Sequence, residues 1–147
     1  PSEISAAFAL EQLKKLKKNI NTRVKNFERI FKFIKQYDRY FDLPTQIPGI
    51  KTGWLAYPII IKKNSKIKRR DMQIFLEKKG IQTRTIFTGN ILRQPIMKKK
   101  KYKKVKNCSI YSNNIMKNGI LIGCHQGLRE VEISYMFKNI KLFLRKY

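Results

Sequence analysis

The sequence predicts an α+β domain in which three short strands are covered by helices. Segments with an apolar residue at every third or fourth position, the period of an amphipathic helix, alternate with short runs of β-branched and aromatic residues that Gly or Pro residues bound. The chain has 147 residues, of which 42% are hydrophobic, and this is enough to bury one core. Together these observations favour a two-layer α+β unit.

The chain opens with a predicted helix from Ser2 to about Tyr40, and Ser2 is its expected N-cap. At ~1.5 Å per residue such a helix would be about 55 Å long, so it either breaks near residues 19–21 or extends beyond a compact domain. An extended helix would suit a connector between two domains. We therefore expect a long connecting helix, broken or continuous, over residues 1–42 and a small domain over residues 43–147.

The other predicted elements follow from the same periods and from the Gly and Pro positions. Pro58 lacks an amide donor, so we expect a sheet edge or a bulge there, and Gly80 is well placed to end a helix. Ile74 and Val131 are among the helical residues expected to face the core. The elements are a strand at 54–61, a helix at 68–79, a strand at 81–87, a loop at 88–107 with room for a short helix, a short helix at 108–117, a strand at 119–124 and a helix at 128–144.

The charge of the chain is strongly positive, because 34 basic residues face only 9 acidic ones, for a formal net charge of +25. Such an excess attracts nucleic acid, anionic membranes or phosphorylated ligands, and the run 98–106 is its densest part. A basic module that binds nucleic acid or an anionic surface is the alternative interpretation of the chain. We give it little weight, because abundant Lys, Ile and Asn together are typical of AT-rich genomes, and no recognition helix or zinc finger accompanies the run.

The cysteines and the single histidine offer little chemistry by themselves. Cys108 and Cys124 exclude a disulfide framework and, with His125, lack the paired spacing of a zinc site. Adjacent residues on a strand point to opposite faces, so Cys124 and His125 are not expected to share a proton as a dyad. No apolar run approaches the roughly 18 residues of a membrane span, and no signal-peptide core is present. We expect a cytoplasmic protein.

The most informative motif lies between residues 80 and 95, where Phe-x-Gly-Asn-x-x-Arg-Gln-Pro follows a Thr-Arg pair. This phrase resembles the C-terminal small domain of the DegT/DnrJ/StrS sugar aminotransferase family, closest to its CDP-4-keto-6-deoxyglucose 3-dehydrase branch. Three more segments fall in the family's order and spacing. They are Pro-x-Glu-x-x-Ala-Ala-x-x-Leu-Glu-Gln-Leu at 1–13, Gly-Trp-Leu-Ala-Tyr-Pro at 53–58, and Asn-Asn-Ile-Met at 113–116 with Gly-Cys-His-Gln-Gly-Leu at 123–128.

The resemblance implies the small domain of a fold type I enzyme dependent on pyridoxal phosphate. In that fold a long connecting helix precedes a short, mostly antiparallel sheet covered by helices. The large domain, which carries the cofactor, would lie upstream of Pro1, so we expect the chain to be a piece of a longer polypeptide and inactive by itself. The family's implied substrate is a nucleotide-activated keto-deoxy sugar, used in deoxy or amino sugar and surface polysaccharide biosynthesis.

Several properties of the implied enzyme stay open. The family holds pyridoxal phosphate through a lysine, whereas the dehydrase branch has a histidine and works with pyridoxamine phosphate, and neither position lies in this sequence. Dehydration and aminotransfer are therefore both compatible with it, as is any sugar or nucleotide. Some dehydrases carry an iron-sulfur cluster, which two cysteines cannot hold unaided. The resemblance also implies a homodimer and, for a dehydrase, a reductase partner; a helical dimerisation unit built on the first helix is a related option.

The residues that the resemblance places in the substrate and cofactor cleft are Phe87, Gly89, Asn90, Arg93, Arg84 and His125. Arginine can clamp a diphosphate or carboxylate through two parallel hydrogen bonds, and an apolar group at position 87 would avoid unwanted proton transfer. Each also has a structural interpretation: a tight turn for residues 89–90, surface salt bridges for the two arginines, core packing for Phe87, and a structural hydrogen bond for His125. No catalytic residue is assigned.

Overall fold

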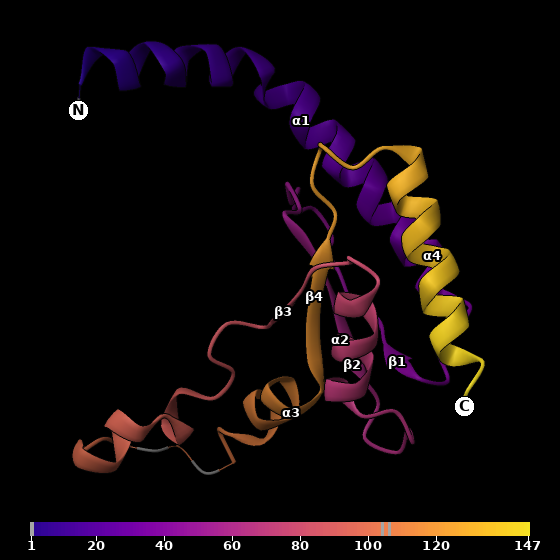
Figure 1. Cartoon of the computed structure of the whole chain (residues 1–147). Coiled ribbons are helices and arrows are strands. Elements are labelled where there is room, and N and C mark those ends of the chain that lie inside the picture. Colours follow the sequence, from indigo (N-terminus) through magenta and orange to yellow (C-terminus); the bar gives the residue numbers. More distant parts are fainter. Residues whose placement is uncertain (1, 104, 106) are drawn as a thin grey trace.

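The computed structural model describes residues 2–103, 105 and 107–147, and it has the predicted α+β architecture (Figure 1). Four helices accompany one sheet in these ranges, and each predicted helix is present within a few residues of its expected position. The elements in chain order are α1 Glu3–Lys35, β1 Phe41–Asp42, β2 Ala56–Ile61, α2 Arg69–Lys78, β3 Thr83–Thr85, the 3-10 turns η1 Ile91–Arg93 and η2 Pro95–Lys99, α3 Ile110–Asn118, β4 Gly119–Gly123 and α4 Glu130–Leu144.

The sheet has the order β1-β2-β4-β3, and all of its neighbouring strands are antiparallel. The prediction of three strands was wrong by one, because β1 was assigned to the end of the first helix. Phe41 continues the three- and four-residue spacing of that helix, and a strand of two residues is too short to show a period of two. Its identity depends on pairing with Ile60 and Ile61, which are distant in the sequence.

Pro58 lies in register opposite Leu121 of β4, without a bulge. On the other side of β2, strand β1 pairs only with Ile60 and Ile61. The side of β2 that lies away from β4 is therefore unpaired at Pro58, and no ladder hydrogen bond is lost to its missing amide. The expectation of an edge is met locally, although β2 is an inner strand.

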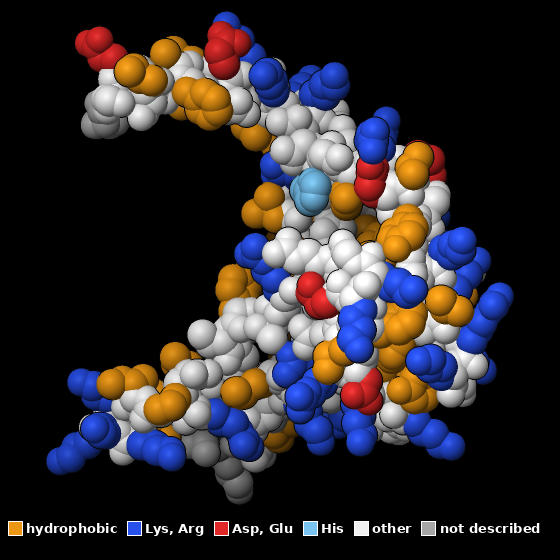
Figure 2. All heavy atoms as spheres, in the orientation of Figure 1, with side chains coloured by type: hydrophobic (Ala, Val, Ile, Leu, Met, Phe, Trp, Pro, Cys, Tyr) orange, Lys and Arg blue, Asp and Glu red, His pale blue; other side chains and the backbone are white. Residues whose placement is uncertain are grey.

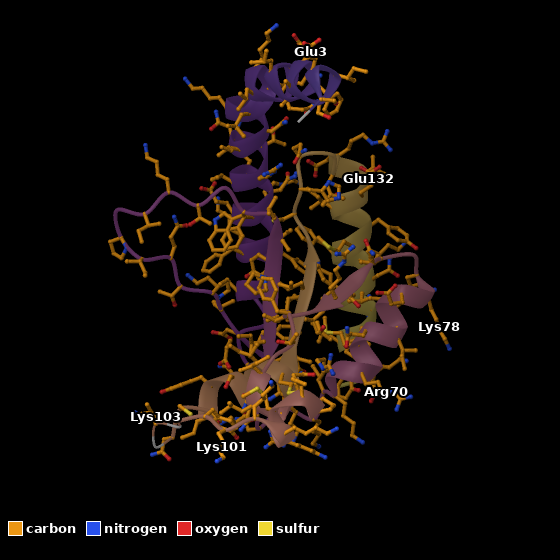
Figure 3. All side chains as sticks on the ribbon, turned by 90° about the vertical axis from the view of Figure 1, so that its left-hand side faces the viewer. Glu3, Arg70, Lys78, Lys101, Lys103 and Glu132 are labelled. Atoms are coloured by element: carbon orange, nitrogen blue, oxygen red, sulfur yellow. The ribbon has the colours of Figure 1, made fainter. Side chains whose placement is uncertain are left out.

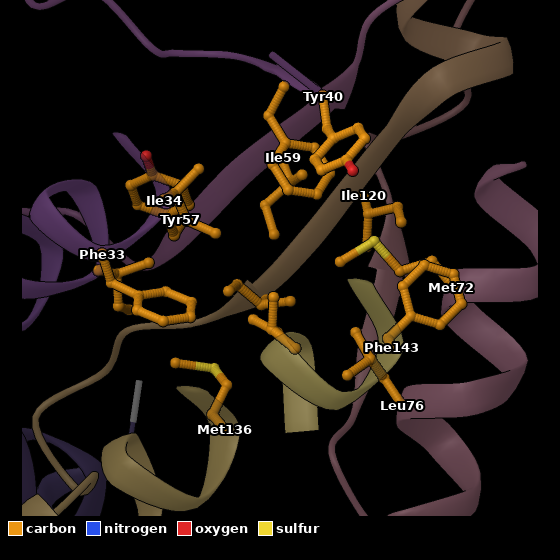
Figure 4. Packing of buried hydrophobic residues seen from close by; sticks show 14 of the residues in the cluster. Phe33, Ile34, Tyr40, Tyr57, Ile59, Met72, Leu76, Ile120, Met136 and Phe143 are labelled. Atoms are coloured by element: carbon orange, nitrogen blue, oxygen red, sulfur yellow. The ribbon is translucent and has the colours of Figure 1, made fainter. Parts of the chain in front are cut away.

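The core lies on one face of the sheet, where α1, α2 and α4 cover alternate residues of the strands (Figure 4). Tyr57, Ile59 and Ile61 of β2 are buried there, as are Ile120 and Ile122 of β4. The helices contribute the C-terminal half of α1, both buried residues of α2 and six residues of α4. These helix residues are Asn26, Phe27, Ile30, Phe33, Ile34, Met72, Leu76, Ile133, Met136, Asn139, Ile140, Phe143 and Leu144.

Two apolar helix residues that were expected to face the core point outward instead. Ile74 and Val131 are exposed, and Met72 and Ile133 occupy the buried positions. The helical period was assigned correctly, and the other expected inward residues Leu76, Met136, Ile140 and Leu144 are buried, so the error is confined to these two positions. Gly80 ends α2 as predicted, with a positive φ of 71°.

Helix α1 is continuous through residues 19–21, so of the two alternatives the structure has the extended helix. It bends along its length and its N-terminal part projects away from the sheet (Figure 1). The Thr22 hydroxyl donates to the Lys18 carbonyl at 3.0 Å, one turn earlier, and such bonds are known to bend helices. The projecting part exposes five large apolar residues, Ile4, Phe8, Leu10, Leu13 and Leu16, beside charged ones such as Glu11 and Lys14.

The outline of the molecule is a crescent (Figure 2). Its upper arm is the N-terminal part of α1, its lower arm is the segment after β3, and the sheet lies between them (Figure 1). The sheet face opposite the core presents half-buried residues, among them Ala56, Pro58 and Leu121. The fold therefore has an open concave flank next to the segment that carries the family-like phrase.

Candidate functional site

The segment from residue 87 to residue 93 forms a turn whose backbone is unusually constrained. Phe87 and Gly89 both have positive φ, of 47° and 67°. A Cβ added to Gly89 would lie 2.4 Å from the Cβ of Met116 in α3, so only glycine fits against this helix. The Gly89 amide donates to the Ile86 carbonyl at 3.1 Å, which closes the turn.

A side-chain clasp ties this turn to α3. Asn90 is only 3% exposed, and its Nδ2 donates to Oδ1 of Asn113 at 2.9 Å, while its own Oδ1 accepts from the Leu92 amide at 3.0 Å. Arg93 Nε donates to the same Asn113 oxygen at 2.6 Å. The clasp uses one edge of the Arg93 guanidinium and, within the described residues, leaves its terminal nitrogens available for an anion.

Phe87 is 87% exposed, so the core-packing interpretation of this residue is wrong. A bulky residue at positive φ is uncommon, and such backbone strain costs roughly 1–3 kcal/mol. The Thr85 hydroxyl donates to the Phe87 carbonyl at 3.1 Å and helps to hold this conformation. An apolar ring held in solvent at such a cost is typical of a residue that contacts a ligand or another surface.

Arg84 lies at the centre of β3, opposite Leu121, so its side chain lies on the sheet face away from the core. It is exposed, as is Arg93, and neither arginine belongs to the ion pairs found in residues 2–103, 105 and 107–147. The salt-bridge interpretation is therefore not supported for either residue. Strand β3 is an edge of the sheet, which leaves Arg84 next to the concave flank.

His125 follows the end of β4 and is exposed, while its neighbour Cys124 is fully buried. Burial raises the pKa of the Cys124 thiol to about 11, and the two side chains point to different environments, so a Cys–His dyad is absent as predicted. The Gly127 amide donates to Nδ1 of His125 at 3.2 Å, and the His125 carbonyl accepts from the Asn26 side chain at 3.0 Å. The histidine thus has a structural hydrogen bond, and among the described residues its Nε2 has no hydrogen-bond partner.

The six expected site residues do not form one cluster. Phe87, Gly89, Asn90 and Arg93 lie together, and the turn borders a hollow of about 290 Å³ that Arg69 and Met116 also line. His125 lies at the other end of the β3–β4 ladder, beside a separate hollow of about 410 Å³ under α4. Arg84 lies between the two along β3.

Asn113 and Met116 are the site residues that sequence reasoning missed. Both belong to the family-like segment at 113–116, but no local pattern shows that this segment packs against a turn that lies 20 or more residues earlier in the chain. The resemblance of residues 113–116 to the family was the only feature of the sequence that pointed to Asn113 and Met116. In the part of the chain that the structure describes, no group of His, Cys, Asp and Glu is arranged to hold a metal ion.

The structure describes the lysine run at 98–106 except for residues 104 and 106. Lys98 to Lys101 and Lys103 are exposed, Lys98 and Lys99 end η2, and Lys104 and Lys106 lie outside the described residues. Among the helices of residues 2–103, 105 and 107–147, none combines the length and apolarity that crossing a bilayer requires.

Solved structures define the class of this domain, because it matches the C-terminal part of structures with the fold of PLP-dependent aminotransferases. An Escherichia coli GDP-4-keto-6-deoxy-D-mannose-3-dehydratase with bound hydrated PLP superposes with a TM-score of 0.84 at 33% identity, over 95% of this chain and 35% of that one. An aminotransferase from Psychrobacter cryohalolentis has a TM-score of 0.81 at 12% identity, which shows the shared fold alone.

The chain belongs to the DegT/DnrJ/EryC1/StrS aminotransferase family, whose profile matches residues 2–141. It is 33% identical to the GDP-4-keto-6-deoxy-D-mannose 3-dehydratase of Escherichia coli O55:H7, over 96% of this chain and 36% of that protein. It is 27% identical to the lipopolysaccharide biosynthesis protein RfbH of Salmonella typhimurium, over 97% of this chain and 32% of RfbH. The chain spans about a third of the length of these relatives.

Proposed function

We propose that this chain forms one wall of the active site of a PLP- or PMP-dependent enzyme that acts on a nucleotide-activated 4-keto-6-deoxy sugar. The reaction is C3 dehydration or sugar aminotransfer, in the biosynthesis of deoxy or amino sugars for surface polysaccharide. The observation that supports it most is the exposed, strained Phe87 in a turn that Asn90 and Asn113 hold rigid. The relatives at about a third identity are sugar 3-dehydratases.

The residues of the turn suit different parts of such a ligand. The Phe87 ring offers a flat apolar surface to a sugar or to a cofactor ring. The guanidinium groups of Arg93 and Arg84 suit the diphosphate of a nucleotide sugar, because a planar fork of donors matches phosphate oxygens. Gly89 and Asn90 shape the turn, and His125 borders the same concave flank from the other end of the ladder.

The described residues suit one side of an active site better than an enclosed binding site for the cofactor. The hollow beside the turn is about 290 Å³, at the lower limit of the roughly 300–1,000 Å³ that is usual for small-molecule sites, and it is lined by residues of the turn together with Arg69 and Met116. Groups outside this chain would have to hold the ring and its phosphate. When bound, the cofactor supplies the electron sink for chemistry at the sugar carbon; Phe87 and the two arginines would orient the substrate and exclude water.

The proposal includes the setting of the enzyme. A cytoplasmic homodimer is proposed, together with a reductase partner if the reaction is dehydration. The apolar surface on the projecting part of α1, from Ile4 to Leu16, supports a covered position for this helix in the full protein.

The test begins with the coding sequence upstream of Pro1. A lysine at the cofactor position there favours aminotransfer, and a histidine favours dehydration. The encoded protein, purified with PLP, should show the absorbance of the bound cofactor. It should convert PLP to PMP when glutamate is added, and it should consume a GDP- or CDP-linked 4-keto-6-deoxy sugar. Arg93→Ala should raise KM for the sugar nucleotide at least tenfold with unchanged PLP binding. A purified protein that binds no PLP would overturn the proposal.

A further inference from the structure

A groove lined by basic side chains, here called the basic groove, lies between the segment that joins β2 to α2, the first turn of α2, and α3. Its volume is about 590 Å³, within the range of roughly 300–1,000 Å³ that is usual for small-molecule sites. Lys and Arg side chains gather over this lower end of the molecule in Figure 2. The groove is therefore both concave and charged.

Within the described residues, no acidic side chain lines the basic groove or pairs with its cations. Seven of its thirteen lining residues are Lys or Arg, and none is Asp or Glu. The three ion pairs formed within the described residues involve none of the groove's cations. Cations that face each other across a concave surface repel, and an anion placed between them would relieve this repulsion.

Neutral donors complete the lining on the α3 side. Asn113 accepts two hydrogen bonds at Oδ1, from Asn90 and Arg93, so within the described residues its Nδ2 is available to the groove. Asn114 likewise accepts from Asn118 at 2.7 Å and keeps its own amide donors. Amide donors and ammonium groups together match the oxygens of a phosphate.

The α2 side adds the positive end of a helix. In the described part of the chain no side chain caps α2 at Lys68, and Lys68, Arg69 and Arg70 at this end of the helix line the groove. Arg69 is held in place, since Nε donates to the Lys117 carbonyl at 3.1 Å and a terminal nitrogen donates to Gln73 at 2.8 Å. The two walls of the groove are thereby joined through Arg69.

We propose that the basic groove binds a small polyphosphate anion, with a di- or triphosphate group between the α2 and α3 walls. The convergence of cations from two walls onto one hollow favours a compact multivalent anion over a flat surface. The basic groove also adjoins the turn at residues 87–93, because Asn113 lines the groove and bonds to the turn, and Arg69 lines the hollow beside Phe87. This inference does not depend on the proposed enzyme activity.

The test uses the 147-residue chain without PLP and inorganic tripolyphosphate as the probe. Calorimetric titration should show one saturable site per chain, with an affinity that falls as salt is raised. The groove variant Lys66→Gln/Arg70→Gln/Lys117→Gln removes three exposed cations and should weaken binding about tenfold or more. Circular dichroism would establish that the variant is folded, and Arg70→Lys alone should retain most of the affinity.

The matched control is Lys98→Gln/Lys99→Gln/Lys101→Gln, which removes the same charge from the neighbouring lysine run. Arg70 and Lys101 lie on opposite sides of the lower end of the molecule (Figure 3). The control should bind tripolyphosphate within about twofold of the unmodified chain. Equal losses in both variants, or no saturable site, would overturn the proposal in favour of diffuse charge. Tight binding of an oligonucleotide or of phosphatidylserine vesicles that tripolyphosphate fails to displace would overturn it in favour of a macromolecular partner.

Discussion

The core face of the sheet and the turn at residues 87–93 use apolar residues in opposite ways. Ile120 and Ile122 of β4 are buried against helices, together with Ile59 of the neighbouring strand. The turn next to β4 holds Phe87, which is larger and equally apolar, in solvent at a positive φ. The core gains its stability from area removed from water, whereas the turn accepts strain and exposure in order to present a side chain. Apolar character alone thus does not tell a core residue from a contact residue.

The largest expected effect of a single substitution is in the core. Ile120 is completely buried in β4, and Ile120→Ala should lower the free energy of unfolding by about 4 kcal/mol, through lost burial and a residual cavity. Urea denaturation measures this. A loss below about 1 kcal/mol would mean that the sheet face is less tightly packed than described.

The next largest effect should be at Gly89, where a methyl group meets both positive φ and Met116. Gly89→Ala should cost about 3 kcal/mol, because strain and steric overlap add. Gly80→Ala is the matched control, with a positive φ but no atom within 4 Å of the added Cβ, and it should cost about 1 kcal/mol. Equal losses would show that α3 does not press on the turn.

A smaller loss is expected from the clasp. Asn113→Ala removes the acceptor of Asn90 and Arg93 and leaves the buried Asn90 amide unsatisfied, at a cost of about 2 kcal/mol. Asn113→Asp keeps an acceptor oxygen and should cost less than about 1 kcal/mol. Thermal unfolding of the two variants tests the order; a reversed order would contradict the clasp.

The smallest effect on stability should come from the exposed ring. Phe87→Ser should change the free energy of unfolding by no more than about 0.5 kcal/mol, because little surface is buried there. In the full enzyme, Phe87→His should shift the partition between dehydration and aminotransfer, since it adds a proton carrier beside the reacting groups. Product analysis measures the partition, and an unchanged ratio would count against a role in the cleft.

Much of the fold could be predicted from local patterns. The period of α1, the stop at Gly80 and the strands around residues 56–61 and 119–123 depend on residues close in sequence, and each lies within a few residues of its expected place. The two-residue strand β1 could not be predicted, because it exists only through its pairing with β2. The outward positions of Ile74 and Val131 depend on how α2 and α4 are rotated on the sheet, which the helical period leaves open.

The candidate site divides in the same way. The phrase at 87–95 singled out the turn, because Gly89 and Asn90 have local conformational preferences that are visible in the residues themselves. The exposure of Phe87, the buried position of Asn90 and the separation of His125 from the turn were decided by contacts with α3 and by the direction of β4.

By itself the sequence determined the family, the class of fold and the order of the elements other than β1, since these follow from local periods and a recognisable motif. Only the tertiary structure decided which residues of that motif are presented and which are enclosed. Tertiary packing also brought the cations of residues 62–70 and Lys117 around the basic groove. The physical reason is that exposure and charge convergence depend on which distant segments pack together, and the free energy of packing is shared among residues that no local pattern connects.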